Sequence, residues 1–337
     1  MSVSIQNICS ASSEEWDYIW KQCDYSTYFH SREWAEIWNE YSKGKMRPDP
    51  QIVIFNDGKR AILPLSYQKN LKGLVKRYFS SPAGTFGGWI SADDLDKNHG
   101  ILLAEVLTKK HNNLIWRMNP YDKLVFESGV RFSKYDETHS LNLEGGFDAL
   151  YKQWTKGHAS AARKARKAHK AGIAIKIAEN LDDWKEYYRA YQDSLRRWGN
   201  DASSAYSWKL FEILNKRNSL NIKLWLAIYE GKMIAGSLCF YAKNHVVYWH
   251  GAAYSAYFKL RPVNLLMYEV IKNACNQRYF WFDFNPSGGN EGVKNFKKSF
   301  GAKPMNSSVY RSSNYVDRMV EKILGWVKQV EWSSLRA

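Results

Sequence analysis

Two segments of this 337-residue chain resemble each other and lie about half a chain length apart. The first reads VIFNDGKRAILPLSYQK at residues 53–69, and the second reads LAIYEGKMIAGSLCFYAK at residues 226–243. Each has an apolar run, an acidic residue followed by glycine, and a second apolar run, which is typical of a β-hairpin. Gly58 aligns with Gly231, and each half of the chain has the size of a common domain. The repeat therefore predicts two similar lobes in tandem.

The second half predicts a mixed order of strands and helices, beginning with the strand THSLNLEG at 138–145. The elements expected after it are helices at 146–156, 159–171, 181–197 and 204–217, strands at 222–229, 233–242 and 246–254, a helix at 263–276 and a strand at 279–285. A helix that crosses between the last two strands fits one layered sheet. The first half also begins with helical segments, SEEWDYIWKQC and SREWAEIWNEYSK, ahead of its hairpin.

The composition is that of a globular protein, with 45% hydrophobic and 24% charged residues. The formal net charge of +16 attracts polyanions. Nucleic acid, an anionic membrane and phosphorylated small molecules such as CoA or sugar nucleotides all satisfy this charge. The charge alone does not choose among them.

The four cysteines form no CxxC pair, which argues against a zinc ribbon or a dithiol redox site. We expect no metal site, and we expect Cys239 and Cys275 to be buried thiols. The N-terminus lacks the charge and apolar run of a signal peptide, and no stretch of about eighteen apolar residues occurs. We expect a cytoplasmic protein, with a position at the inner face of the membrane as an alternative.

The segment SAARKARKAHKAG at 160–172 is the densest run of positive charge. On a helix its alanines share one face, and the opposite face carries Arg163, Arg166, Lys167 and Lys170. Arginine forks suit phosphate geometry, so the stripe is a candidate contact for a phosphorylated acceptor. A solvated helix face is the alternative.

The segment KLRPVNLLMYEVIKNACNQ predicts a packed helix whose first turn contains Pro262. A helix start offers backbone N–H groups and the positive end of a dipole to phosphate. Lys259 and Arg261 lie beside this start, so we expect it to bind a donor, together with Asn264.

Several of these segments together resemble the GNAT-type N-acyltransferases of the FemAB/CelD–BioF-like group, whose best-known branch is the Fem-type aminoacyltransferases. The resemblance covers about 139–311, and it rests on the segments ARKARKAHKAG, YEGKMIAGS, RPVNLLMYEVI, YFWFDFN and FKKSFGA. It implies an α/β fold of two GNAT-like lobes, each with a mixed, mostly antiparallel sheet flanked by helices. The glycine-containing pyrophosphate loop usual in GNAT enzymes is absent, because KLRPVN stands in its place. The donor implied is acyl-CoA, or alternatively aminoacyl-tRNA, with no other cofactor.

This resemblance implies roles for particular residues. Lys297 would stabilise the oxyanion of acyl transfer, with a surface lysine as the alternative. Asp283 would act as a base or as a structural acceptor of backbone N–H groups. His250 is a rival base, or else a core histidine. Tyr248 shares its strand face and would contact the donor.

Arg197 and Trp198, near the end of the predicted helix at 181–197, are candidates for the acceptor wall, or else they belong to a capped surface helix end. The predicted domains are a first lobe at 1–138, a catalytic lobe at 139–311 and an amphipathic helix at 312–337. That last helix would pack on the domain or contact a membrane surface.

The function expected is N-acyl transfer from acyl-CoA to an amine of a phosphorylated cell-envelope precursor, either an amino-sugar nucleotide or a peptidoglycan or polysaccharide precursor. Fem-type transfer from aminoacyl-tRNA is the alternative within the class. A non-enzymatic RNA-binding protein is the alternative outside it, although no RNP motif, KH loop or helix-turn-helix is visible. We expect no DNA partner.

Overall fold

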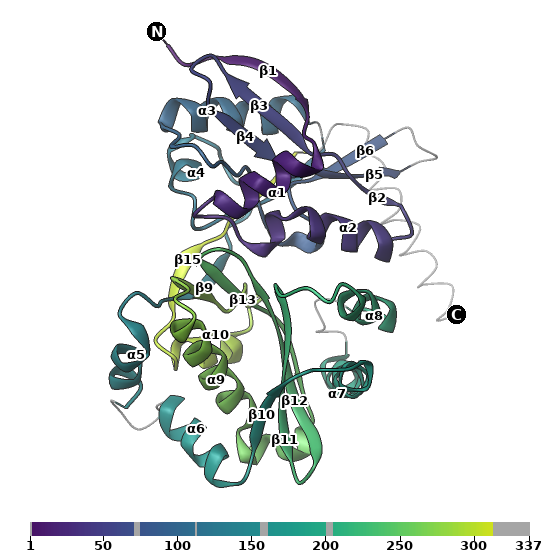
Figure 1. The fold of residues 1–337 in the computed structure, drawn as a ribbon, viewed down its shortest axis with the longest axis vertical. Helices are drawn as coiled ribbons and strands as arrows, with labels where there is room; N and C mark the ends of the chain where they lie inside the picture. Colours follow the sequence, from purple (N-terminus) through teal and green to yellow (C-terminus); the bar gives the residue numbers. More distant parts are fainter. Residues whose placement is uncertain (1, 71–74, 112, 156–160, 200–204, 313–337) are drawn as a thin grey trace, which may run out of the picture.

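The computed structural model describes residues 2–70, 75–111, 113–155, 161–199 and 205–312, which form two lobes stacked along the long axis of the molecule (Figure 1). The predicted helix at 312–337 lies outside these residues except for Ser312. No helix in the described ranges has the length and apolarity needed to cross a membrane. Within the same ranges, no cluster of His, Cys, Asp and Glu side chains is suited to hold a metal ion.

The first lobe contains two sheets, one of three strands and one of six. The smaller sheet has the order β1-β3-β4, made of β1 (Ile5–Ser10), β3 (Gln51–Phe55) and β4 (Arg60–Leu63). The larger sheet has the order β16-β8-β6-β5-β2, with β7 beside β8; its strands are β2 (Met46–Pro48), β5 (Ser66–Asn70), β6 (Val75–Phe79), β7 (Phe86–Gly87), β8 (Leu114–Met118) and β16 (Val309–Arg311). The longer helices of this lobe are α1 (Ser13–Gln22), α2 (Arg32–Tyr41), α3 (Lys97–Glu105) and α4 (Lys123–Glu127).

The second lobe is built on one seven-stranded sheet with the order β10-β11-β12-β13-β14-β9-β15. Its strands are β9 (Glu137–Asn142), β10 (Ala174–Ile177), β11 (Ile222–Tyr229), β12 (Lys232–Tyr241), β13 (His245–Ala253), β14 (Trp281–Asp283) and β15 (Lys303–Asn306). Its helices are α5 (Gly146–Thr155), α6 (Ala161–Lys170), α7 (Leu181–Trp198), α8 (Trp208–Lys216), α9 (Pro262–Asn276) and α10 (Glu291–Lys298). The predicted elements of this half are therefore confirmed, with shifts of a few residues at their ends. The crossover through α9 is confirmed as well, because it joins the parallel neighbours β13 and β14.

Four elements of the second half were not predicted from the sequence: β10, α10, β15 and β16. Each is short, with three to eight residues, so its local pattern is weak. β16 pairs with β8, so the chain returns to the first lobe before residue 311. The catalytic lobe predicted at 139–311 therefore includes a strand that belongs to a sheet of the first lobe. The pairing of strands that are distant in sequence decides this boundary, and local sequence patterns do not predict such pairing.

The hairpin repeat is confirmed. β3 pairs with β4 and β11 pairs with β12, both in antiparallel register. Gly58 and Gly231 occupy the turns with φ of +86° and +73°, the left-handed region that glycine enters without steric cost. In each lobe a strand and two helices precede the hairpin, and in the first lobe the short strand β2 lies between α2 and β3.

The seam between the lobes is a packed core. Trp34 of α2 lies 5.2 Å from the ring of Phe240 in β12 and 5.5 Å from that of Trp249 in β13. Tyr28 stacks on Phe240 with ring centroids 4.7 Å apart. Burying one such aromatic side chain contributes about 1.5–3 kcal/mol, so these contacts hold the lobes at a fixed relation.

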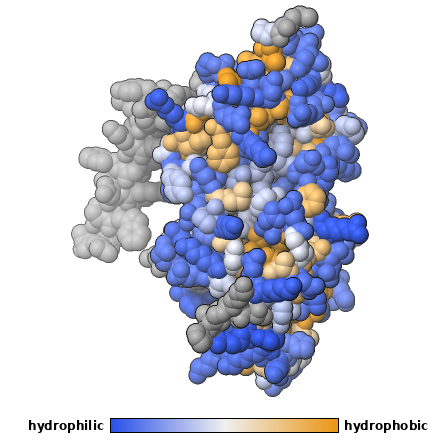
Figure 2. Space-filling view, turned by 90° about the vertical axis from the view of Figure 1, so that its left-hand side faces the viewer, coloured by the Kyte–Doolittle hydropathy of each residue, from blue (hydrophilic) through white to orange (hydrophobic). Residues whose placement is uncertain are grey.

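The predicted face division of α6 is confirmed. Its alanines are buried, and the helix packs against α9 and α5. Arg163, Arg166 and Lys167 are exposed on the other face. On the face shown in Figure 2, hydrophilic residues dominate and apolar residues are gathered in small groups.

Candidate active site

The sheet of the second lobe opens where β13 and β14 separate. Their parallel pairing ends at the pair Val247 and Asp283, whereas β13 continues to Ala253. Just beyond this point the register of β13 against β12 shifts, and Trp249 is the extra residue of a β-bulge. A bulge re-aims the side chains around it. Tyr248, Trp249 and His250 therefore turn into the opening instead of continuing a regular ladder.

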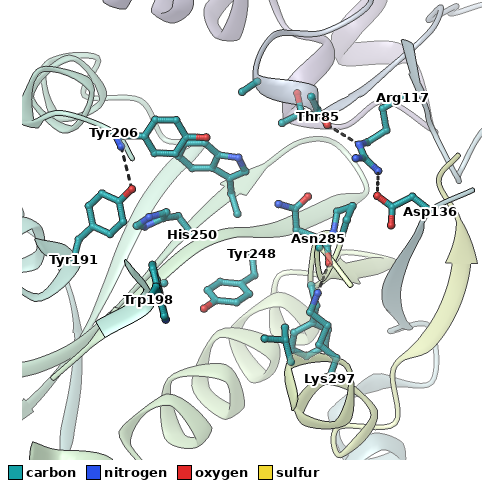
Figure 3. Close-up of a pocket in the computed structure, with 18 residues that line it drawn as sticks. Thr85, Arg117, Asp136, Tyr191, Trp198, Tyr206, Tyr248, His250, Asn285 and Lys297 are labelled. Carbon is teal, nitrogen blue, oxygen red and sulfur yellow. Dashed lines mark hydrogen bonds and ion pairs between the residues drawn. The ribbon is translucent and has the colours of Figure 1, made fainter. Parts of the chain in front are cut away.

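A cavity of about 490 Å³ lies over this opening, where the two lobes meet. We call it the Lys297 cavity. Its walls are formed from the second lobe by side chains of β13, the end of α7, the loop after β14 and α10, and from the first lobe by Thr85, Arg117 and the segment before β9 (Figure 3). The site is thus built by both halves of the chain.

A second cavity, of about 480 Å³, lies beside it at the start of α9, and we call it the α9 cavity. Its lining is mainly apolar and includes Phe258, Val263 and Phe296. Tyr248, Val293 and Lys297 line both cavities. The two cavities therefore share a wall at the Lys297 side chain.

Lys297 is the charged group of this junction, and its side chain is almost completely buried, with 2% of the residue exposed. Its ammonium donates to the backbone carbonyl of Asn285. Burial lowers its pKa to about 8, although the charges of Asp283, Asp136 and Glu137 act in the opposite direction. Below that pH the side chain remains a cation. The prediction that Lys297 lies at the site is supported by this position, whereas Lys298 is exposed.

Asp283 lies next to the cavity but does not line it. Its carboxylate accepts hydrogen bonds of 2.5 Å from the hydroxyls of Tyr121 and Thr138 and from the backbone N–H of Asn285. Burial raises its pKa, and these three donors act in the opposite direction. The geometry supports the structural-acceptor alternative for Asp283 and does not place it against a substrate.

His250 lines the Lys297 cavity inside a ring of aromatic side chains. Its Nδ1 shares a 2.5 Å hydrogen bond with the hydroxyl of Tyr187, and its ring lies 4.4 Å from that of Tyr191. Burial lowers the pKa of His250 to about 3, so the imidazole is neutral. A neutral imidazole fixed on one nitrogen can orient an amine, but it is a weak base.

Arg117 and Asp136 are site residues that the sequence did not indicate. The Arg117 guanidinium donates to the Asp136 carboxylate at 2.9 Å, to the carbonyl of Gly84 at 2.6 Å and to that of Ser307 at 3.1 Å. The pair lies on the wall opposite Lys297 (Figure 3). No local motif marks these positions, because the first lobe reaches the site only through tertiary packing.

The candidate acceptor residues divide into two groups. Trp198 lines the Lys297 cavity, and Arg197 lies over the ring of Phe258 at 4.8 Å. Arg163, Arg166 and Lys167 line neither cavity, since the α6 stripe faces solvent. Helical periodicity correctly predicted which face of α6 is exposed. It does not predict whether that face lies near the active site.

The candidate donor residues gather at the α9 cavity. Tyr248, Arg261 and Asn264 line it, and Asn264 is buried with no hydrogen-bond partner at its Nδ2. Lys259 belongs to the preceding 3₁₀ helix (Ser255–Leu260) and does not line the cavity. Arg261, with φ of +61°, is the N-cap of α9.

Comparisons with known proteins agree with this architecture. Residues 155–298 match the family described as acetyltransferase (GNAT) domain. No curated protein is significantly similar to the chain. The solved structure of FemX superposes with a TM-score of 0.69 at 13% identity, covering 94% of this chain and 100% of FemX.

Two further solved structures share the fold. L-PGS from Bacillus licheniformis has a TM-score of 0.55 at 13% identity and covers 90% of this chain and 93% of its own. The C-terminal domain of a putative lysylphosphatidylglycerol synthetase from Agrobacterium fabrum has a TM-score of 0.52 at 11% identity, covering 81% and 86%.

Residues 155–298, which form most of the second lobe, thus match a GNAT acetyltransferase domain, and this match identifies the chain as an acyltransferase. The whole chain shares its two-lobed fold with FemX, which agrees with the Fem-type resemblance seen in the sequence.

Proposed function

We propose that this chain transfers an acyl or aminoacyl group from an activated donor to an amine of a phosphorylated cell-envelope precursor. The observation that carries the proposal is the place of Lys297, a buried cation in the wall shared by two cavities. Acyl transfer needs two substrates that meet at one carbonyl carbon, with a fixed positive group beside the carbonyl oxygen. This arrangement supplies those requirements with residues of the described chain alone.

The reaction follows from this geometry. The acceptor amine attacks the donor carbonyl carbon, a C–N bond forms, and the carbonyl oxygen becomes an oxyanion that accepts a hydrogen bond from Lys297. The carbon–sulfur or carbon–oxygen bond to the carrier then breaks. The proton lost by the amine ends on the leaving sulfur or oxygen, so the transfer balances without another reactant. His250 and the Asn285 loop orient the amine, and no covalent enzyme intermediate is required.

The two cavities suit different partners. The Lys297 cavity combines the Arg117–Asp136 pair with aromatic faces, including Trp198 and the stacked rings of Tyr206 and Trp249, 5.3 Å apart. Aromatic faces and charged hydrogen-bonding groups suit a polar acceptor such as an amino sugar. The mainly apolar α9 cavity suits the acyl end of the donor.

The start of α9 bears on the identity of the donor carrier. Pro262 has no N–H, and the N–H groups of Asn264 and Leu265 both donate to the carbonyl of Arg261, at 3.1 and 3.4 Å. Few free backbone donors therefore remain to hold a pyrophosphate. This feature favours aminoacyl-tRNA as donor, whose phosphates need not reach this turn, over the acyl-CoA expected first from the sequence. The lysylphosphatidylglycerol synthetase among the fold neighbours, named for a membrane lipid, supports the cell-envelope assignment.

The test supplies each donor with candidate acceptors and follows product mass. We would incubate the protein with acetyl-CoA or with bulk aminoacyl-tRNA, together with amino-sugar nucleotides and peptidoglycan precursors. The expected result is an acceptor that gains the mass of one acyl or aminoacyl group, formed about a hundredfold more slowly or less when Lys297→Met replaces the wild type. Calorimetric titration with CoA, tRNA and polyphosphate at near-physiological salt assigns the carrier. Absence of both turnover and saturable donor binding would overturn the proposal.

A further inference from the structure

A third cavity, of about 740 Å³, lies at the other ends of the strands that form the site. His245 and Trp281, the first residues of β13 and β14, line it, whereas Tyr248 and Asn285 near the later ends of these strands line the Lys297 cavity. A strand rises about 3.3 Å per residue, so the two cavities are roughly 10 Å apart along β13. The first lobe closes the cavity with the start of α4 and the loop at 91–95. We call it the Asp122 cavity.

Asp122 is an unusual lining residue, because its carboxyl group is buried and only half satisfied. The residue is 2% exposed. Its Oδ1 accepts the backbone N–H of Leu124 at 3.0 Å as the N-cap of α4, and its Oδ2 has no hydrogen-bond partner in the described structure. Burial raises its pKa to about 7. A buried polar atom without a partner is destabilising, so a donor that enters the cavity would be stabilising.

The remaining wall is acidic and aromatic. The other charged lining residues are Asp24, Asp93, Asp94 and Lys123, so with Asp122 four acidic side chains and one lysine line this cavity in a chain whose net charge is +16. Asp24 forms an ion pair with Lys243 at 2.8 Å, and Asp93 accepts the backbone N–H of Arg60 at 2.7 Å. Among the described residues, the side chain of Asp94 makes no salt bridge and no hydrogen bond.

The aromatic part of the wall contains Tyr25, Tyr121, Phe280 and Trp281. The ring of Tyr121 lies 4.2 Å from that of His245 and 5.4 Å from that of Trp281. Burial lowers the pKa of His245 to about 3, so it adds no positive charge. Aromatic faces attract an organic cation through their negative π surfaces.

We propose that the Asp122 cavity binds a small alkyl primary ammonium ion, with the ammonium on Asp122 and the alkyl chain along Tyr121 and Trp281. A primary ammonium supplies the N–H donor that the Oδ2 of Asp122 lacks, and its charge matches the acidic wall. An anion would meet four carboxylates, and a neutral alcohol would leave the charge unmatched. This site is separate from the one used in the proposed function and does not depend on it.

The experiment is a calorimetric titration of the full chain with cadaverine, a diamine, and with its neutral isostere 1,5-pentanediol. The protein as a whole repels cations, so saturable binding requires a local site. We expect cadaverine to bind saturably and pentanediol not to bind. Asp122→Asn should weaken cadaverine binding at least tenfold, and Asp148→Asn, an exposed carboxylate of α5, should leave it unchanged.

Two further variants keep the outcome interpretable. Asp94→Asn changes an exposed rim residue and should weaken binding severalfold even if Asp122→Asn does not fold. Asp136→Asn, in the Lys297 cavity, should leave the affinity unchanged. Equal binding of pentanediol, no saturation with the wild type, or a larger loss in Asp136→Asn than in Asp94→Asn would overturn the proposal and leave a cavity that holds water only.

Discussion

Lys297 and Asp283 both form hydrogen bonds with the backbone of Asn285, one at its carbonyl and the other at its N–H. The Lys297 ammonium donates to the carbonyl of Asn285, and the N–H of Asn285 donates to the Asp283 carboxylate at 2.5 Å. Asn285 itself has a φ of +61°, which non-glycine residues adopt at a cost of about 1–3 kcal/mol. The two side chains therefore fix a strained turn at the mouth of the cavity. The position of the cation depends on the carboxylate through this turn.

Lys297→Met should remove the oxyanion donor while retaining most of the buried side-chain volume. Loss of one such donor raises the barrier by roughly 3 kcal/mol, so kcat should fall about a hundredfold or more. KM for the donor should change little, because the apolar contacts of the α9 cavity remain. Steady-state kinetics on the transfer reaction give both constants.

Lys298→Met is the matched control, since it removes an exposed lysine from the next position of the same helix. It should retain activity within about twofold. If both variants lose activity equally, the effect belongs to the charge of α10 and the role assigned to Lys297 is wrong.

The pH profile should show the ionisation of Lys297. Burial lowers its pKa to about 8, so the protonated form dominates below that value and is lost above it. We expect kcat to decline as pH rises through about 8, in contrast to an uncatalysed reaction that gains from deprotonation of the amine. Lys297→Arg, which stays charged throughout this range, should lack that decline at whatever rate it retains. A wild-type profile that is flat to pH 10 would contradict this assignment.

Asp283→Asn tests a positioning role. An amide has one acceptor oxygen in place of two, so at least one of the three donors on Asp283 loses its partner, at a cost of about 1–3 kcal/mol in unfolding free energy. The negative charge of Asp283 raises the pKa of Lys297, so its removal should move the alkaline limb of kcat to lower pH. Denaturant unfolding and the pH profile measure the two effects. A purely structural role would change stability and leave the limb in place.

The order of elements in the second lobe could be predicted because its signals are local. Pro262 and the apolar positions that follow it specify α9, and short, nearly continuous apolar runs specify β11 to β13. The same holds for the alanine face of α6. Lys297 and Tyr248 were identified through a motif and a strand face, and the structure brings both to the same junction.

The half of the site that comes from the first lobe could not be predicted. Arg117 and Asp136 meet Lys297 only after β8 and the segment before β9 pack across the seam. The role of Asp283 also depends on Tyr121 and Thr138, which are distant in sequence. Tertiary packing brings these residues together, and the spacing of residues along the chain does not predict such contacts.

Arg117→Met should weaken acceptor binding more than it weakens the structure. The guanidinium is partly exposed to the cavity, with 16% of the side chain accessible, and it holds Asp136 and two backbone carbonyls. Its loss leaves Asp136 unpaired on the acceptor wall, so KM for the acceptor should rise about tenfold with a smaller change in KM for the donor. Arg131→Met, an exposed arginine of the same lobe that does not line the cavity, is the control. The opposite pattern, with the donor constant alone affected, would reverse the assignment of the two cavities.

Gly251→Ala should disturb the wall between the cavities at little cost in stability. A Cβ at position 251 would lie 1.9 Å from the hydroxyl oxygen of Tyr248, closer than any real contact, so the phenol ring must move. The displaced atom is the far end of a side chain that faces a cavity, so we expect a loss of about 1 kcal/mol in unfolding free energy, at the lower end of what overpacking costs. Because Tyr248 lines both cavities, kcat/KM should fall for donor and acceptor alike. Tyr248→Phe removes the 1.9 Å contact but leaves the ring Cζ 2.8 Å from the added Cβ, so it should recover only part of the activity in the Gly251→Ala background. If Gly251→Ala alone is fully active, Tyr248 is not part of the surface at which donor and acceptor meet.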